Sequence, residues 1–501
     1  MGIHTPLFLK GDNTVNFIDN LIGYFNPEAG ARRCAYRGLM EELREERNYD
    51  AGMGSRFNSG WKAQNQSAEM TDRIDRDIIR ARARDLERNS DIANSVLLAF
   101  RRNVIGAGFT VRPKTGDEEL NGIIREEWER WCKARNCDVT ERQSFSAMMR
   151  MAEQRKRVDG GMLIRKCYIK GARIPFKLQA LEVDELDATA TGPPRNKDNK
   201  IVNGIEYNLY NRIEGYWIKQ YDIDGWSINQ PKYVDAKDMI FIFDKNRPSQ
   251  IREMSNMASA MPRIRDANEF MTAVSIKQRI EACLAVFVKK YLPQKTGRVQ
   301  TGPEGTYKNK KLSPGMIMEL NPGDDVQSIN PSGQSADAAS MIKLHQRMIG
   351  AGQGVSYEAT SRDMSQSNYS SARQGMIEDG LTFVEDKELI LETLFDEIYE
   401  TFIISAWLAG VLDIKDFWEN KETYLAHMWV EKPKPWIDPL KEANANRIAL
   451  EKGIKTYQQI AAENGRDWKE QLNEMAEVIE HGKEKGIDME GILYGKSGKK
   501  A

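Results

Sequence analysis

Cysteine and histidine are scarce in this chain of 501 residues, which contains five of the first and four of the second. The cysteines are Cys34, Cys132, Cys137, Cys167 and Cys283. Their number is odd and their spacing irregular, so they define no disulfide framework. Cys132 and Cys137 could suggest half of a metal site, but no histidine stands at a ligand-like spacing from them. We therefore expect ordinary thiols in a reducing, intracellular setting and no bound metal.

Long apolar runs are also missing from the sequence. No stretch approaches the ~20 residues that a membrane-spanning helix needs, and the apolar run Met239–Phe243 has the length of a strand. Residues 1–10 lack a basic start followed by an apolar core, which predicts no signal peptide. We expect no membrane among the partners of this chain.

An excess of charge of either sign is absent as well. The chain has 73 basic and 74 acidic residues and a net charge of −1. A protein that grips DNA phosphates over its whole surface usually carries a clear basic excess. The balance disfavours a sequence-reading DNA binder, although a local surface could still face DNA.

Motifs for catalysis are lacking too. The closest approach to a phosphate-binding loop, Gly491–Ser497, has one residue too few between its glycines and no helix after it. The acidic segment 184–187 is more typical of a solvated loop than of a cation site. Gly350, Gly352 and Gly354 favour a hinge or a helix terminator over a phosphate cradle. We expect no catalytic residues, no metal site and no cofactor.

The periodicity of the first half predicts helices followed by a sheet. Helical patterns cover residues 72–100, 118–134 and 145–158, and Ile74, Ile78 and Leu86 would share one face of the first helix. Residues 160–243 read as mostly β, with hairpin signals at Asn203-Gly204 and Asp224-Gly225. The combination predicts an α+β fold class.

The second half is predicted to be helical again. A helix from Ser259 to Val288 leads to an excursion with a strand at 316–320, a helix at 335–349 and a polar, flexible loop at 350–367. A long helix, 369–408, follows, with apolar residues at i, i+3, i+4, i+7 and i+11 on one face: Leu391, Leu394, Phe395, Ile398 and Phe402. The pattern alone fits an α-helical domain with a β insert. It also fits a helical hairpin whose tip engages a partner, beside a mobile loop near a channel.

An ordered series of short motifs adds information that periodicity lacks. The most specific segment is Asn368-Tyr369-Ser370-Ser371-Ala372-Arg373, and the others are Tyr49-Asp50-Ala51, the segments 82–89, 103–108, 159–161, 178–182, 204–207 and 247–250, and Trp436-Ile437-Asp438-Pro439. Taken in this order, the series resembles the lambda family of phage portal proteins over roughly residues 49–465. Two departures are Ser249, where the family usually has glycine, and the segment 251–255, which follows the family pattern loosely.

The resemblance implies a portal-protein fold whose subunits form a ring, usually of twelve, around a DNA channel. The implied regions are an N-terminal wing (1–257), a first stem helix (258–288), a clip (289–334), a second stem helix (335–349), a tunnel loop (350–367), a spine helix (368–404), a second part of the wing (405–438), a helical crown (439–486) and a tail (487–501).

The resemblance also implies where function lies. The residues expected to face DNA in the channel are Arg362, Ser365, Gln366, Ser367 and Asn368, for which a solvated surface loop is the alternative. The residues expected to dock the packaging motor are Lys289, Lys290, Lys308, Lys310 and Lys311, for which a solvated lysine run is the alternative.

The implied partners are double-stranded DNA bound without sequence specificity, the large terminase subunit, head-completion or adaptor proteins, and the major capsid and scaffolding proteins. The implied location is the portal vertex of the virion, and the host cytoplasm during assembly. Two other functions stay open: a different head–tail structural adaptor, or an intracellular enzyme acting on nucleic acid, for which the sequence shows no carboxylate or histidine cluster.

Overall fold

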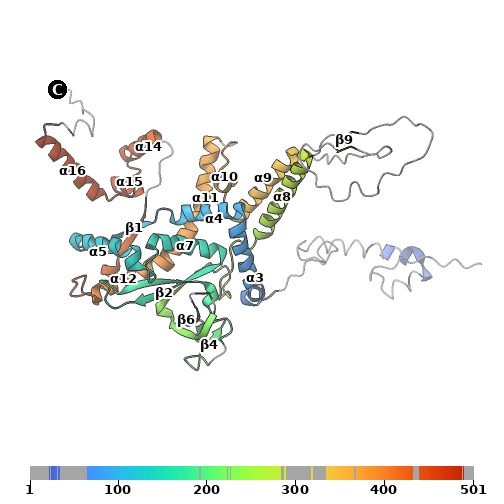
Figure 1. The fold of residues 1–501 in the computed structure, drawn as a ribbon, viewed down its shortest axis with the longest axis horizontal. Helices are drawn as coiled ribbons and strands as arrows, with labels where there is room; N and C mark the ends of the chain where they lie inside the picture. The colour runs from blue at the N-terminus through green and yellow to red at the C-terminus, as the bar shows by residue number, and fades with distance from the viewer. Residues whose placement is uncertain are drawn as a thin grey trace, which may run out of the picture. The chain divides into compact units, whose positions relative to one another are not determined.

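The computed structural model divides the chain into two units, residues 1–66 and 67–501. It describes residues 22, 24–30, 32–33, 36, 65–190, 193–222, 224–225, 227–283, 287–288, 318–319, 335–365, 368–432, 439–487 and 489. The described residues of the first unit are mainly helical, and the second unit contains the elements labelled in Figure 1.

The N-terminal part of the second unit is mainly helical, as predicted. Its helices are α3 (Ala68–Asn89), α4 (Asp91–Phe100), the π-turn η2 (Arg101–Ile105), α5 (Glu118–Trp131), α6 (Ala134–Cys137) and α7 (Phe145–Val158). The helix predicted over 72–100 is divided at Ser90, which has an extended backbone and accepts a hydrogen bond from the Ala93 amide as the N-cap of α4. Strand β1 (Phe109–Pro113) pairs with the distant β11 (His427–Glu431).

Two antiparallel sheets form the predicted β region. The first has the order β3-β2-β8, with β2 (Gly161–Tyr168), β3 (Phe176–Leu181) and β8 (Met239–Phe243). The second has the order β4-β5-β6-β7, with β4 (Lys200–Val202), β5 (Ile205–Tyr207), β6 (Ile213–Tyr221) and β7 (Ser227–Asp235). Short 3-10 turns lie at Val183–Glu185 (η3) and Ala236–Asp238 (η4). Both predicted hairpins are confirmed, because Gly204 joins β4 to β5 and Gly225 joins β6 to β7, each with positive φ.

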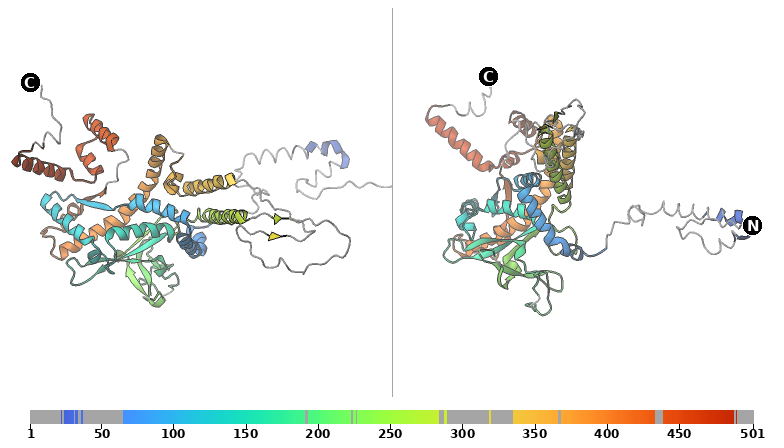
Figure 2. Two further views of the ribbon diagram at one scale, coloured as in Figure 1. Left: turned by 45° about the horizontal axis from the view of Figure 1, so that its top comes forward. Right: turned by 45° about the vertical axis from the view of Figure 1, so that its right-hand side comes forward.

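The three-stranded sheet is buried on both faces, which explains its apolar strands. Met162 and Ile164 of β2 belong to the main core, whereas Leu163 between them belongs to the core of the four-stranded sheet. Helix α7 contacts β2 and β8, and the ribbon views place the helices on one side of this sheet and β6 on the other (Figures 1 and 2).

The second half has the predicted order of elements with different boundaries. They are α8 (Met261–Cys283), β9 (Phe287–Val288), β10 (Met318–Glu319), α9 (Ser335–Gly352), α10 (Tyr357–Ser361), α11 (Tyr369–Ile390), the π-turn η5 (Leu391–Phe395), α12 (Asp396–Leu408), α13 (Lys421–Leu425), α14 (Pro439–Glu451), α15 (Tyr457–Glu463) and α16 (Trp468–Glu484). The helix predicted to reach Val288 is shorter, because Phe287 and Val288 pair in parallel with β10 instead. The α+β fold class is confirmed.

The main core joins α12 to the N-terminal helices. Trp128 of α5 contacts the rings of Tyr399 and Phe402 at centroid distances of 5.5 and 5.1 Å, and Trp131 stacks on Phe176 at 5.3 Å. Such aromatic pairs add stability beyond the burial of their area. Leu394, Phe395, Ile398 and Phe402 are fully buried, so the apolar face predicted from their spacing is confirmed.

The predicted apolar face of the first helix is wrong at Ile74 and Ile78, whereas Leu86 packs against the main core. Ile74 and Ile78 of α3 are 77% and 50% exposed, and the buried residues include Arg76 and Arg80. The reason is electrostatic: Arg80 pairs with the Glu253 carboxylate of a distant segment, and Arg76 donates a hydrogen bond to the Glu253 carbonyl, so this helix packs through a charged face.

Candidate functional site

The segment between α9 and α11 is more ordered than the predicted loop at 350–367. Helix α9 continues to Gly352, and residues 357–361 form the one-turn helix α10. Ser356 caps α10 by accepting a hydrogen bond from the Ala359 amide at 3.1 Å. Asn368 caps α11 in the same way, from the Ser371 amide at 2.8 Å. We call residues 353–365 the α10 loop.

Two side chains of α11 hold the start of this loop. The Asp379 carboxylate accepts hydrogen bonds from the Ser356 amide and hydroxyl, each at 2.6 Å, and is buried. The Thr382 hydroxyl donates to the Gly354 carbonyl at 2.6 Å. Gly354 has φ +73°, and a Cβ there would lie 3.1 Å from the Thr382 side chain, so glycine fits this turn best. The loop is therefore anchored to the helix that follows it.

Asp363 organises the other end of the α10 loop. Its carboxylate accepts hydrogen bonds from the Tyr357 hydroxyl and the Ser365 amide, both at 3.1 Å, and lies 3.5 Å from the Lys343 ammonium. Hydrogen bonds from Ser365 and Tyr357 lower the pKa of Asp363 to about 2. The carboxylate is thus ionised, and its partners are two hydrogen-bond donors of the loop and the ammonium group of Lys343 on α9.

Three of the five residues expected to face DNA are described by the structure. Arg362, Ser365 and Asn368 are all exposed, and Arg362 has the left-handed backbone of a helix C-cap. They lie at the end of α10 and the start of α11, and among the described residues these three side chains do not contact one another to form one compact site. Gln366 and Ser367 lie outside the described residues, as do Lys289, Lys290, Lys308, Lys310 and Lys311.

A buried charge cluster lies behind the α10 loop. The Lys156 ammonium of α7 is fully buried and pairs with Asp244 at 2.8 Å and Asp386 of α11 at 2.7 Å. Burial alone would lower the pKa of Lys156, but the surrounding carboxylates raise it above its ordinary value. Asn256 donates to Asp244 with its side chain and accepts a hydrogen bond from Gln353 of the loop, at 3.0 Å. The loop and α11 are thus tied to the same cluster.

The cluster continues to a carboxyl group with an unusual environment. Arg157 pairs with Asp386 and, at 3.0 Å, with Glu153, and its guanidinium carbon lies 3.0 Å from the centre of the Phe100 ring. Burial raises the pKa of Glu153 to about 7, although Arg157 and Lys156 act to lower it. Its Oε2 has no hydrogen-bond partner among the described residues.

The family model that describes phage portal proteins of the lambda family matches residues 54–385, which is more than half of the chain. The chain belongs to the lambda family of phage portal proteins. The identity indicated by the ordered motifs is confirmed.

Known portal proteins align with most of this chain. The probable portal protein of Halomonas phage phiHAP-1 is 25% identical over 464 residues, 88% of each chain. Portal protein B of Escherichia phage lambda is 22% identical over 481 residues, 86% of this chain and 89% of that one. Among solved structures, a chain in the neck of an empty gene transfer agent particle, computed with C6 symmetry, is 12% identical with a TM-score of 0.45, covering 77% of this chain and 93% of that one.

In this portal chain, a row of arginines on α3 that pairs with carboxylates of other segments was not predicted from the sequence. Arg80 pairs with Glu253 at 3.0 Å and with Asp184 at 3.1 Å, and Arg84 pairs with Asp159 at 2.7 Å and with Asp184 at 2.6 Å. The acidic segment 184–187 is therefore not simply solvated, because Asp184 and the buried Asp187 are engaged in ion pairs. The spacing of Arg76, Arg80 and Arg84 at i, i+4 and i+8 was the available signal.

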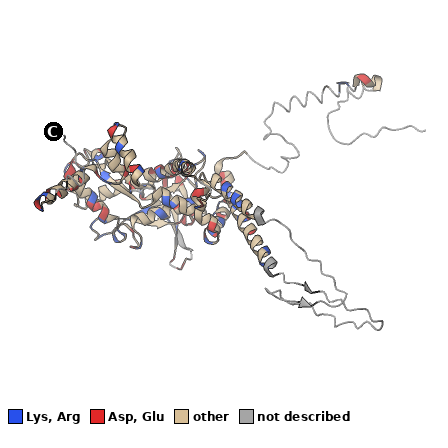
Figure 3. Ribbon diagram, turned by 90° about the horizontal axis from the view of Figure 1, so that it is seen from above, with Lys and Arg blue, Asp and Glu red and all other residues tan. Residues whose placement is uncertain are grey.

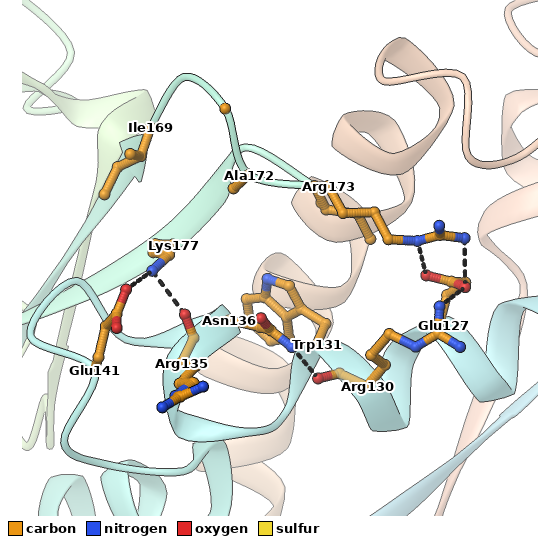
Figure 4. A pocket seen from close by; sticks show the side chains of 12 residues that line it. Glu127, Arg130, Trp131, Arg135, Asn136, Glu141, Ile169, Ala172, Arg173 and Lys177 are labelled. Carbon is orange, nitrogen blue, oxygen red and sulfur yellow. Dashed lines mark hydrogen bonds and ion pairs between the residues drawn. The ribbon is translucent and has the colours of Figure 1, made fainter.

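A cavity of about 500 Å³ lies between α5, α6 and the β2–β3 turn (Figure 4). Its charged groups largely pair with one another: Glu127 accepts bidentate hydrogen bonds from Arg173 at 3.0 and 2.9 Å, and Lys177 pairs with Glu141 at 2.9 Å. The charged residues that line the cavity are therefore engaged in ion pairs with one another, which does not favour a ligand-binding site.

The described part of the chain contains neither a candidate metal cluster nor a candidate membrane span. No group of three or more histidine, cysteine, aspartate or glutamate side chains could hold a metal there. No helix among these residues is long and apolar enough to cross a bilayer. Basic and acidic residues alternate over the described helices rather than gathering on one face (Figure 3).

Proposed function

We propose that this portal chain is the repeating subunit of a ring, of twelve copies, at one vertex of the capsid. Double-stranded DNA would pass through the ring during packaging and ejection. The chain would act as a structural channel and not as an enzyme, and ATP hydrolysis would belong to the separate terminase. Membership of the portal family is the observation that carries this proposal.

Near-neutral charge supports a channel through which DNA can slide. Each phosphate neutralised by lysine or arginine adds affinity, and twelve subunits multiply every contact. A net charge of −1 avoids a strongly attractive channel. A ring of twelve subunits of 57.2 kDa would have a mass of about 690 kDa. Light scattering and negative-stain images test this assembly, and a stable monomer at high concentration would contradict it.

The α10 loop is the segment proposed to face the DNA. It has an exposed tip, which includes Arg362, Met364 and Ser365, and it is anchored at Asp379. Arg362 contributes a cation at this tip, whereas the Asp363 carboxylate accepts hydrogen bonds from Tyr357 and Ser365 of the loop and pairs with Lys343 of α9. A loop held at its base with a weakly charged tip can touch DNA without gripping it.

Substitution of Met364 tests this role, because its side chain is 52% exposed. Met364→Lys would add one cation per subunit, and we expect slower packaging that recovers as salt is raised. Met364→Gln has a similar size without the charge and should package at the normal rate. Equal packaging rates and DNA retention for both variants would show that the loop does not face DNA.

The clip lysines are proposed to dock the packaging motor and then the head-completion proteins. This proposal rests on the family resemblance and on the basic character of Lys308, Lys310 and Lys311 in the sequence. Their combined reversal to glutamate should weaken binding of the large terminase subunit. Unchanged binding would reject docking through these residues. The capsid and scaffolding proteins are the further partners proposed for a subunit that resides in the virion and assembles in the host cytoplasm.

A further inference from the structure

Helix α11 has apolar side chains on two opposite faces. One face is buried within the subunit and includes Phe383 and Ile390. The opposite face has Ile377, Leu381 and Val384 at i, i+4 and i+7, and these side chains are 55%, 61% and 43% exposed. The single subunit therefore covers one of the two faces and leaves the other open.

A second exposed apolar stripe lies on α9. Met341, Leu344 and Met348, at i, i+3 and i+7, are 43%, 50% and 41% exposed, whereas Ile349 is buried. Methionine side chains adapt readily to a packing partner. In Figures 1 and 2, α9 and α11 run in different directions, so the two stripes lie on helices that are not parallel.

Most of the exposed charges beside the stripe of α11 are acidic, although Arg373 lies one turn before Ile377, and the charges near the stripe of α9 are basic. Glu378 and Glu385 are exposed beside the stripe of α11. On α9, Arg347 borders the stripe, with its guanidinium 5.7 Å from the centre of the Tyr357 ring, and Lys343 lies one turn earlier, 3.5 Å from Asp363. The Lys343 side chain is 35% exposed and Arg347 is also exposed, so both cations can contact a further partner. The stripes are thus complementary in charge as well as in apolar character.

We propose that the α11 stripe of each subunit packs against the α9 stripe of its neighbour. Glu378 and Glu385 of one subunit would then face Lys343 and Arg347 of the next. This inference rests on the proposed ring. A ring closes by a heterologous contact, in which two different surfaces of every subunit meet. A second copy of the chain is favoured as the occupant because each subunit supplies both complementary surfaces once.

This contact would have a consequence for the α10 loop. The loop joins α9 to α11, so an interface on each helix would flank every loop with neighbouring subunits. The position of the loop would then depend on the ring and on its own anchor at Asp379. Burial of apolar area between copies would stabilise the assembled ring and not the isolated subunit.

The first test disrupts the apolar stripe. The double variant Ile377→Glu/Leu381→Glu should lose the ring species in size-exclusion chromatography with light scattering, while its far-ultraviolet circular dichroism stays unchanged. Leu408→Glu is the matched control, because Leu408 is 70% exposed at the end of α12 and should leave the ring intact. Normal rings from the double variant would overturn the pairing. A wild-type chain that forms no ring would instead defeat the proposed function.

The second test exchanges the charges. Glu378→Lys/Glu385→Lys and Lys343→Glu/Arg347→Glu should each shift assembly to higher protein concentration, and the four changes together should restore it. Glu400→Lys, at an exposed position of α12, is the control for an added cation. If the combined variant assembles as poorly as either pair, the two surfaces do not meet and the proposal is overturned.

Discussion

The two halves of α11 differ in how far their side chains are buried within the subunit, although they form one continuous helix. From Phe383 to Ile390, one face is packed against the main core, and Asp386 enters the buried charge cluster. From Tyr369 to Leu381, most side chains are exposed, including the large apolar residues Met376, Ile377 and Leu381. The buried half is explained by contacts within the subunit. The exposed half has no such explanation, which is why we assign it to contacts between subunits.

The difference shows that apolar residues can be placed for an assembly as well as for a fold. Large exposed apolar patches on a soluble subunit commonly mark interaction surfaces. The α10 loop is held close to the boundary of the two halves, by the buried Asp379 and by Thr382. Three substitutions test the difference between the halves.

The largest effect is expected from the buried charge cluster. Lys156→Ala would leave Asp244 and Asp386 without their shared cation, and a broken buried ion pair typically costs about 3–5 kcal/mol. The free energy of unfolding, measured by chemical denaturation, should fall by that amount. Lys170→Ala removes an exposed lysine and should change it by less than about 0.5 kcal/mol. Equal stabilities would mean that α11 is not tied to the core through Lys156.

A smaller, pH-dependent effect is expected from Glu153. Burial raises its pKa from 4.5 to about 7, so the folded state binds more protons than the unfolded state between these values. Stability should therefore decrease as the pH rises through this window, by about 1–3 kcal/mol, and stay lower above it. Glu153→Gln should remove that part of the slope. An identical pH profile for the variant, measured by denaturation, would contradict an unusual protonation of Glu153.

The smallest effect is expected at the anchor of the loop. Asp379→Asn keeps one acceptor for the two hydrogen bonds from Ser356 but removes the charge, at a cost of about 1 kcal/mol. Amides of residues 353–363 should then exchange hydrogen faster, while those of α12 stay protected. Glu388→Gln, an exposed carboxylate on the same helix, is the control. Unchanged exchange in the loop would show that Asp379 does not hold it.

Apolar spacing predicted the buried face of a helix correctly where apolar contacts orient the helix, and incorrectly where charged contacts orient it. Leu394, Phe395, Ile398 and Phe402 are buried as their spacing required, because apolar area drives their packing whatever the partner. Ile74 and Ile78 follow a similar spacing and are exposed, since the contacts of Arg76 and Arg80 with the distant Glu253 set the orientation of α3. A helical pattern does not show which of its faces has partners.

The candidate site, too, was predictable from the sequence only in part. The glycines and polar residues of 350–368 identified the connection between two helices, and the ordered motifs identified the portal family. The one-turn helix α10 and its anchor at Asp379 could not be predicted, because Ser356 and Asp379 are 23 residues apart and either could have met water instead.

Local sequence patterns were sufficient to predict the α+β composition, the order of helices and strands, the two hairpins and the family. Each of these follows from local periodicity, turn chemistry or motif order, which neighbouring residues encode. Three features depend on contacts across the fold: the buried faces of α3 and α11, the carboxylates that pair with Lys156, and the hydrogen bonds that anchor the α10 loop. These depend on long-range pairing between segments far apart in the chain, and the energy of a charge or an apolar side chain is set by what surrounds it.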